Sequence, residues 1–220
     1  MTDLSRTERK RQRTRTALIE ATRKLAYRGG EEKISVQDIT EEADVGLGTF
    51  YNYFEHKQAI FEAVLDGIQE MFDAQLDKFR ANLNDPAMLM AAALKYTFQQ
   101  AQHNEDWLIF LEYSGRSRDE ILHQSLAQCL SFMQQGVTGG RFKIGDMHFT
   151  LNLIRGMVRH VILEIDKGNL EPKTSAEAIR CILRMLGLPD VVARALAESP
   201  LPPVSAPRRS PLPEVINWKR

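Results

Sequence analysis

Apolar side chains recur every three or four positions along most of this 220-residue chain, and polar side chains fill the positions between them. This spacing is typical of amphipathic helices, whereas a strand would alternate apolar and polar positions. Capping residues, glycines and prolines divide the pattern into segments. We expect helices at residues 5–27, 35–43, 47–53, 55–82, 86–103, 106–114, 119–136, 146–167, 174–187 and 189–198. The sequence therefore predicts an all-α fold.

Several of these helices have capping residues at their expected starts. A serine or threonine followed three positions later by an acidic residue forms a capping box, in which each partner satisfies a backbone N–H of the first turn. The predicted boxes are Ser5 with Glu8, Ser35 with Asp38, and Thr174 with Glu177, and Asp119 and Asp146 are expected to act as single caps.

The first helices have the order of a helix-turn-helix. Two short helices, joined by a tight turn at residues 44–46, lie between one long helix and another. The stretch VGLGTFYNYFEHK covers this turn and the second short helix. Phe50 and Phe54 have core spacing, but residues 51–53 crowd the face that should meet water. Because the second helix of this motif enters the major groove, we expect that face to contact DNA.

Hydroxyl and charged side chains in this stretch suit phosphate contacts. Thr49, Tyr51 and Tyr53 can donate hydrogen bonds to phosphate oxygens, and Lys57 adds a positive charge. Gly48 would let the backbone approach DNA closely. The alternative for the two tyrosines is partial burial in the core, since a tyrosine ring can pack while its hydroxyl reaches outward.

Two other side chains of this helix are candidates for base recognition. The amide of Asn52 can pair with adenine through two hydrogen bonds, a contact that contributes about 1–3 kcal/mol of discrimination. Leu47 is apolar but is expected to project outward, which suits a thymine methyl group. The alternative for Leu47 is packing against the first helix.

The chain has 29 basic and 29 acidic residues, but the charge is unevenly distributed. Residues 1–28 contain nine basic and three acidic residues, a local net charge of +6. If this stretch is helical, Arg6, Lys10 and Arg13 share one face. Such a basic face suits DNA, and its alternative is a solvated N-terminus.

No segment approaches the length of a membrane span, and the stretch MTDLSRTERKRQRTRT lacks the apolar middle of a signal peptide. We therefore expect a cytoplasmic protein without a membrane partner. Cys129 and Cys181 lie among apolar residues at helical spacing, so we expect both to be reduced core residues. The five histidines are dispersed, and no nucleophile, metal-ligand pair or phosphate-binding loop is recognisable. The sequence thus predicts no enzyme, no cofactor and no metal site.

The stretch SVQDITEEADVGLGTFYNYFEHKQAI resembles the helix-turn-helix of the TetR family of bacterial transcriptional regulators. The matching positions are Ala43, Val45, Gly48, Thr49, Phe50, Tyr51, Tyr53, Phe54 and Lys57. The resemblance implies phosphate contacts for Ser35, Thr49, Tyr51, Tyr53 and Lys57, base contacts for Gln37, Leu47 and Asn52, and close approach at Gly48. The resemblance also implies an inverted-repeat operator on double-stranded DNA.

The stretch departs from the family pattern at two places. Asp44 replaces the usual turn glycine, although aspartate adopts the left-handed conformation better than most residues. Gly46 and Leu47 replace a serine and a polar or basic residue, which removes a hydroxyl contact and alters the expected base preference.

We expect residues 1–55 to form the DNA-binding domain and residues 56–198 to form a helical domain for effector binding and dimerisation. Segment 146–167 is apolar on more than one side, which fits a helix packed against its own core and against a partner chain. In the family, two such helices per subunit form a four-helix bundle. The predicted interface residues are Val158, Val161, Ile162, Ile165, Ile179, Ile182, Leu183 and Leu186.

The resemblance also implies an effector pocket, and the large side chains of the middle helices are its candidates. These are Phe98, Trp107, Phe110, Leu111, Tyr113, Phe132, Met133, Phe149, Leu153 and Met157. The alternative is that they simply fill the core. The stretch FLEYSGRSRDE at 110–120 loosely resembles the equivalent part of acyl-responsive members, so a fatty acyl compound is one candidate effector.

Residues 199–213 hold six of the nine prolines and are expected to begin an extended or disordered tail, 199–220. The alternative is that Trp218 docks the tail onto the body. The function that follows is a homodimeric transcriptional repressor released from its operator by a small apolar effector. The rival is an all-helical binding protein or enzyme that retains the helix-turn-helix only as a structural relic.

Overall fold

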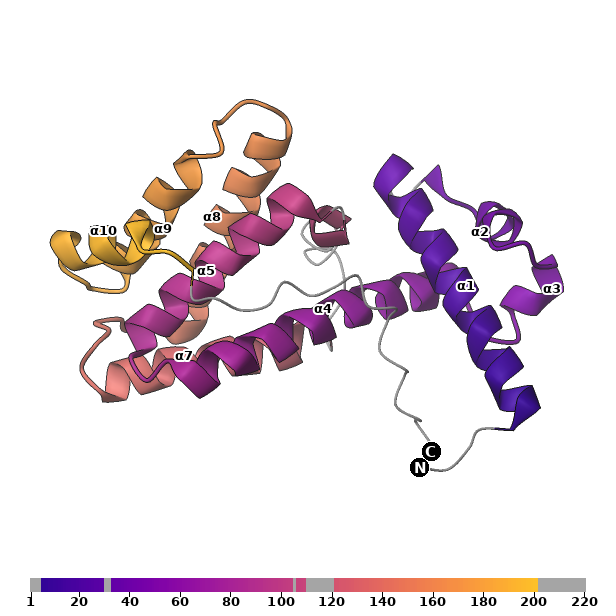
Figure 1. Ribbon diagram of the computed structural model, residues 1–220, viewed down its shortest axis with the longest axis horizontal. Coiled ribbons are helices and arrows are strands. Elements are labelled where there is room, and N and C mark those ends of the chain that lie inside the picture. Colours follow the sequence, from indigo (N-terminus) through magenta and orange to yellow (C-terminus); the bar gives the residue numbers. More distant parts are fainter. Residues whose placement is uncertain (1–4, 30–32, 105, 110–120, 202–220) are drawn as a thin grey trace. The chain divides into compact units, whose positions relative to one another are not determined.

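A computed structural model of the chain describes residues 5–29, 33–104, 106–109 and 121–201. Within these ranges the regular structure is helical, and no strand is formed. The helices in chain order are α1 (Arg6–Gly29), α2 (Val36–Glu42), α3 (Leu47–Phe50), α4 (Lys57–Asn82), α5 (Pro86–His103), α7 (Ile121–Thr138), α8 (Met147–Asp166), α9 (Thr174–Met185) and α10 (Asp190–Glu198) (Figure 1). This confirms the predicted all-α fold.

Most of the expected boundaries hold within two residues, and α3 is the main exception. It ends at Phe50 rather than Tyr53, because the N–H groups of Tyr53 and Phe54 both donate to the Phe50 carbonyl and close a turn. Residues 106–109 are helical, as expected for the start of the 106–114 segment. The rest of that segment, the Asp119 cap and the tail beyond 201, Trp218 included, lie outside the described residues.

The capping predictions are mostly confirmed. Ser5 and Glu8 exchange hydrogen bonds, Ser35 and Asp38 form a complete capping box, and the Asp146 carboxylate accepts from the N–H of Phe149. The predicted box at Thr174 is wrong. Helix α9 continues from a turn in which Lys173 already has helical angles, so no side chain caps it.

The chain divides into two compact units, and the division falls at residues 69 and 70, inside α4. The sequence placed the boundary at residue 55, just before α4 begins. The difference has a physical cause, because the first half of α4 carries buried side chains that belong to the N-terminal unit. Among them are Ile60, Val64 and Ile68.

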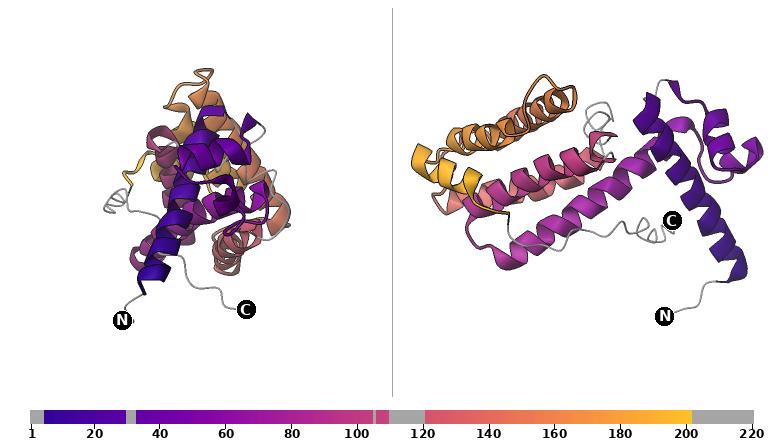
Figure 2. Two further views of the ribbon diagram at one scale, coloured as in Figure 1. Left: turned by 90° about the vertical axis from the view of Figure 1, so that its right-hand side faces the viewer. Right: turned by 45° about the horizontal axis from the view of Figure 1, so that its top comes forward.

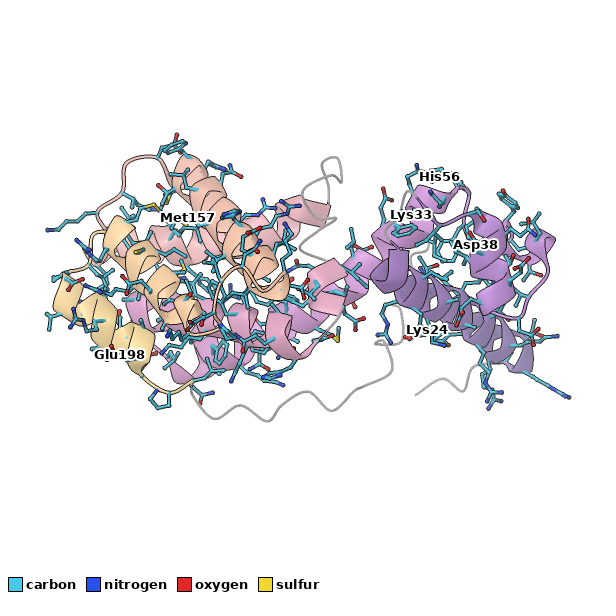
Figure 3. The ribbon with its side chains drawn as sticks, turned by 90° about the horizontal axis from the view of Figure 1, so that it is seen from above. Lys24, Lys33, Asp38, His56, Met157 and Glu198 are labelled. Carbon is cyan, nitrogen blue, oxygen red and sulfur yellow. The ribbon has the colours of Figure 1, made fainter. Side chains whose placement is uncertain are left out.

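Every helix of the N-terminal unit contributes at least one completely buried side chain. Leu18 of α1, Ile39 of α2, Phe50 of α3 and Ile60 of α4 are completely buried. Outside this core, Lys24 of α1 forms an ion pair with Glu42 of α2, with 3.3 Å between Nζ and Oε1 (Figure 3).

The C-terminal unit is built around α5, which contacts α7, α8, α9 and α10. Helices α8 and α9 pack against each other, and the short α10 lies across the end of α9 (Figures 1 and 2). One core cluster consists of Leu76, Phe79, Leu89, Ala92, Tyr96 and Phe132. No helix among the described residues is long and apolar enough to cross a membrane.

Candidate DNA interface and effector domain

The turn between α2 and α3 depends on Asp44, which has a φ angle of +54°. Few non-glycine residues adopt this left-handed conformation, and aspartate is among those that do so most readily. The N–H of Asp44 donates to the Glu41 carbonyl, and the N–H of Val45 donates to the Thr40 carbonyl. The turn therefore forms without the glycine of the family pattern, and it sets the direction of α3.

Helix α3 is held by the buried side chain of Phe50, and Leu47 and Gly48 at its start are exposed. Phe50 is completely buried and contacts Phe54 at 5.7 Å and Tyr51 at 5.3 Å between ring centroids. Leu47 is 52% exposed and Tyr51 is 58% exposed. Such apolar exposure on a four-residue helix is unfavourable in water unless a partner covers it.

None of the nine residues predicted to contact DNA is buried. Leu47 and Tyr51 are mostly exposed, which disfavours burial of Leu47 against α1, although the Tyr51 ring packs edge-on against the buried Phe50. Tyr53 is half-buried, which agrees with the alternative that its ring is partly packed in the core. The exposed positions are Ser35, Gln37, Leu47, Gly48, Tyr51 and Asn52, and the half-buried positions are Thr49, Tyr53 and Lys57.

Local hydrogen bonds position the side chains at the start of α2. The Ser35 N–H and hydroxyl both donate to the Asp38 carboxylate, each at 2.7 Å, and these bonds lower the pKa of Asp38. The Gln37 amide donates to Glu41 at 2.9 Å, on the exposed face of the same helix.

Lys57 has a structural contact in addition to its predicted phosphate contact. Its ammonium group donates to the Ile34 carbonyl at 3.1 Å, which joins the first residue of α4 to the segment before α2. A cation in the first turn of a helix is disfavoured by the helix dipole, and this carbonyl compensates for part of that effect.

An unpredicted contact joins α1 to the end of α3. The guanidinium of Arg15 lies 5.2 Å from the centroid of the Phe54 ring, a cation–π distance. Burial lowers the pKa of Arg15, and Asp66 partly opposes this shift. In the sequence Arg15 is only one member of the basic run, because no local pattern identifies its aromatic partner.

The candidates for the effector pocket fall into two groups. Phe98, Trp107, Phe132 and Met133 are buried, and Trp107 packs on Phe72 of α4 at 5.0 Å between ring centroids. Their packing agrees with the core-filling alternative. Phe149 and Leu153 are 62% and 42% exposed, and neither is among the described residues that line the cavity between the ends of α5 and α8. Met157 is half-buried (Figure 3), and Phe110, Leu111 and Tyr113 lie outside the described residues.

A half-open cavity of about 360 Å³ lies between the C-terminal ends of α5 and α8. Of the predicted pocket residues that the structure describes, only Phe98 lines it. Its other lining residues are Ala101, Gln102, His103, Ile162, Ile165, Asp166 and Pro172. The polar members of this set were not predicted, because on a single helix they are indistinguishable from ordinary surface residues.

The burial of the two apolar faces of α8 differs from what the predicted roles imply. Six of the predicted interface residues are buried by their own chain: Val158, Ile162, Ile179, Ile182, Leu183 and Leu186. Val161 and Ile165 are half-buried. The opposite face of α8 exposes Phe149, Leu153, Gly156 and His160, which we call the α8 stripe. Assignment of either face to a second subunit stays a prediction.

Both cysteines are free, and Cys129 is half-buried rather than fully in the core. Burial raises the pKa of Cys129 to about 11, so its thiol stays protonated and weakly reactive. Cys181 is exposed, which corrects its assignment to the core. Among the described residues, no group of three histidine, cysteine or acidic side chains is arranged to hold a metal ion.

Comparison with known families agrees with this geometry. Residues 18–64 match the model described as bacterial regulatory proteins of the tetR family, and residues 85–199 match the tetracyclin repressor-like C-terminal domain. The second match alone covers more than half of the chain. The chain therefore belongs to the TetR family of bacterial regulatory proteins.

Individual relatives match over shorter stretches. The probable transcriptional regulator ArpR of Pseudomonas putida is 31% identical over 120 residues, which are 54% of this chain and 53% of ArpR. The transcriptional regulator TtgR, also of Pseudomonas putida, is 30% identical over 120 residues, with the same shares. The chain thus matches about half the length of these curated relatives.

Solved structures match over most of the chain. The crystal structure of RolR in complex with resorcinol is 29% identical, with a TM-score of 0.71, and the match covers 90% of this chain and 100% of RolR. FadR of Bacillus subtilis in complex with stearoyl-CoA has a TM-score of 0.61 over 77% of this chain and 96% of FadR. At 18% identity, the likeness to FadR concerns the fold alone.

Proposed function

We propose that this protein is a homodimeric, sequence-specific DNA-binding repressor that a small apolar effector releases from its operator. The observation that carries the proposal is the surface of α3, where Leu47 and Tyr51 project from a helix anchored by buried Phe50. These side chains suit base edges and phosphates better than water. A regulator of this kind acts on DNA in the cytoplasm, the location that the sequence predicts.

Each DNA-facing residue has a role in this proposal. Leu47, Asn52 and Gln37 contact bases, and Gly48 allows close approach. The hydroxyl groups and Lys57 contact phosphates, as the family resemblance implies. Because Gln37 and Ser35 already bond to neighbouring side chains, their contacts with DNA would be made in fixed orientations.

Dimerisation is supported by the α8 stripe. Its four positions are separated by steps of four, three and four residues, which is the spacing of a helix–helix seam. A second copy related by a two-fold axis would bring the same stripe against itself. Two subunits would then present two α3 helices to successive major grooves of an inverted repeat.

The effector is proposed to bind in the C-terminal unit and to favour a conformation with low affinity for DNA. Helix α4 contributes residues to both units, so a shift of α4 would couple the effector site to α3. An aromatic effector is supported by the likeness to RolR, and a fatty acyl effector by the loose resemblance at 110–120. Titration of the protein–operator complex with resorcinol and with laurate would distinguish the two classes.

Selection of bound sites from a random DNA pool tests the DNA-binding proposal. We expect the wild type to enrich an inverted repeat. We expect Asn52→Ala to retain binding but to lose base preference at one position per half-site, because its adenine contact contributes about 1–3 kcal/mol. Asn152→Ala, at an exposed position of α8, is the matched control and should select the wild-type site.

Failure to enrich any sequence at low salt would reject the proposal, because phosphate contacts are strongest under that condition. It would instead favour the rival, in which the helix-turn-helix is a structural relic and the C-terminal unit carries the function.

A further inference from the structure

The N-terminal part of α1 is an exposed, strongly basic helix. Residues 5–15 contain six basic residues and one acidic residue, a net charge of +5. The one acid, Glu8, is engaged in the capping box with Ser5. Five of the six basic side chains are exposed, and Arg15 is half-buried. We call residues 6–13 the basic arm.

The cations of the basic arm lie mostly on one side of the helix. At about 100° per residue, Arg6, Arg9, Lys10 and Arg13 fall within an arc of about 100°. Arg15 lies on the opposite side, where it contacts Phe54. The basic stripe therefore faces away from the core of its own unit. Arg6, Lys10 and Arg13 form no ion pair among the described residues.

The arm is anchored next to the recognition surface. Arg15 stacks on Phe54, Phe54 contacts Phe50, and Phe50 contacts the exposed Tyr51. The capping box at Ser5 keeps the arm helical to its first turn. This series of contacts fixes the base of the arm beside α3. The N-terminal end of α1 projects beyond α2 and α3 (Figure 1).

We propose that the basic arm is a second DNA contact, which binds the phosphate backbone flanking each half-site. This inference rests on the proposed function, because it adds a contact to the same operator complex. From Arg6 to Arg13 the arm rises about 10 Å, and one DNA strand carries about three phosphates per 10 Å of helix axis. Its charge complements the duplex, and its long side chains reach phosphates without reading bases.

The test neutralises three arm cations together, in the variant Arg6→Gln/Lys10→Gln/Arg13→Gln. Glutamine is a good helix former, so the arm should stay helical, which circular dichroism would check. The matched control removes three exposed cations of the C-terminal unit, in Lys78→Gln/Lys143→Gln/Lys173→Gln. Each protein is titrated with its selected operator between about 50 and 200 mM salt, the range over which phosphate contacts weaken strongly.

We expect the arm variant to bind at least about tenfold more weakly than the control at about 150 mM salt. The slope of log affinity against log salt should fall by about 3 per subunit, since each phosphate contact contributes about 0.9. Base preference should not change. Removal of the operator flanks should weaken binding by the wild type and by the control but not by the arm variant.

Equal salt slopes for the arm variant and the control would overturn the inference while leaving the repressor proposal intact. Equal sensitivity of all three proteins to flank removal would overturn it as well. If the wild type binds no operator at about 50 mM salt, where phosphate contacts are strong, both proposals fail together.

Discussion

At the scale of single residues, Gly48 is the clearest sign of an external partner. It lies within α3, yet a methyl group added at its Cα would meet nothing within 4 Å in the protein. Glycine in a helix costs about 0.5–1 kcal/mol relative to alanine. The fold itself does not require this glycine, which agrees with the proposed close approach of DNA.

We therefore expect Gly48→Ala to separate stability from binding. The free energy of unfolding should stay unchanged or rise by about 0.5–1 kcal/mol, because alanine favours the helix. Operator affinity should fall at least tenfold, because the added methyl group would meet the DNA backbone. Urea denaturation and operator titration would measure the two effects. Unchanged operator affinity would remove the close-approach role from Gly48.

At the scale of elements, the end of α7 is fitted closely to the loop that follows it. The N–H groups of Arg141 and Phe142 both donate to the Gly136 carbonyl, and the buried Phe142 ring covers Gly136. The Arg141 guanidinium binds both oxygens of Asp85, the residue that caps α5. This loop therefore joins the end of α7 to the start of α5.

Gly136→Ala should destabilise the C-terminal unit. The new Cβ would lie 2.0 Å from the Phe142 ring, so the ring must move, at a cost of about 1–3 kcal/mol. Gly145→Ala is the control, because its Cβ would meet no atom within 4 Å. Chemical denaturation followed by tryptophan fluorescence would compare the two. Equal stabilities would mean that the loop adapts without loss of packing.

At the scale of the whole molecule, the α8 stripe is an exposed surface that a partner helix would cover. Phe149 and Leu153 are large and exposed. Gly156 lies between Leu153 and His160, and because it has no side chain, a second helix could approach α8 closely there. A helix that is apolar on two opposite sides is typical of a position between two packing layers.

Leu153→Asp should convert the proposed dimer into monomers. Two carboxylates would be buried without partners, which destabilises an interface by about 3–5 kcal/mol, so the dimer dissociation constant should rise by more than about 100-fold. Met88→Asp is the matched control, since Met88 is 44% exposed and lies in the first turn of α5. Sedimentation velocity would measure both. If both variants behave alike, the stripe is not the interface.

The sequence by itself determined the features that depend on nearby residues. The helical period, the capping boxes at Ser5 and Ser35, and the tolerance of Asp44 for a left-handed turn each involve residues within a few positions of one another. For the same reason, the exposed residues of α3 could be predicted. Their neighbours Phe50 and Phe54 have the spacing of core residues, which leaves the remaining positions on the outer face.

Only the tertiary structure decided which apolar surfaces point inward. The pattern of α8 predicts two apolar faces but contains nothing that ranks them, because the helices that cover one face come from distant parts of the chain. The contact of Arg15 with Phe54 and the cavity beside His103 depend on the same long-range packing. Periodicity fixes how side chains are arranged around one helix, whereas burial is fixed by the other helices packed against it.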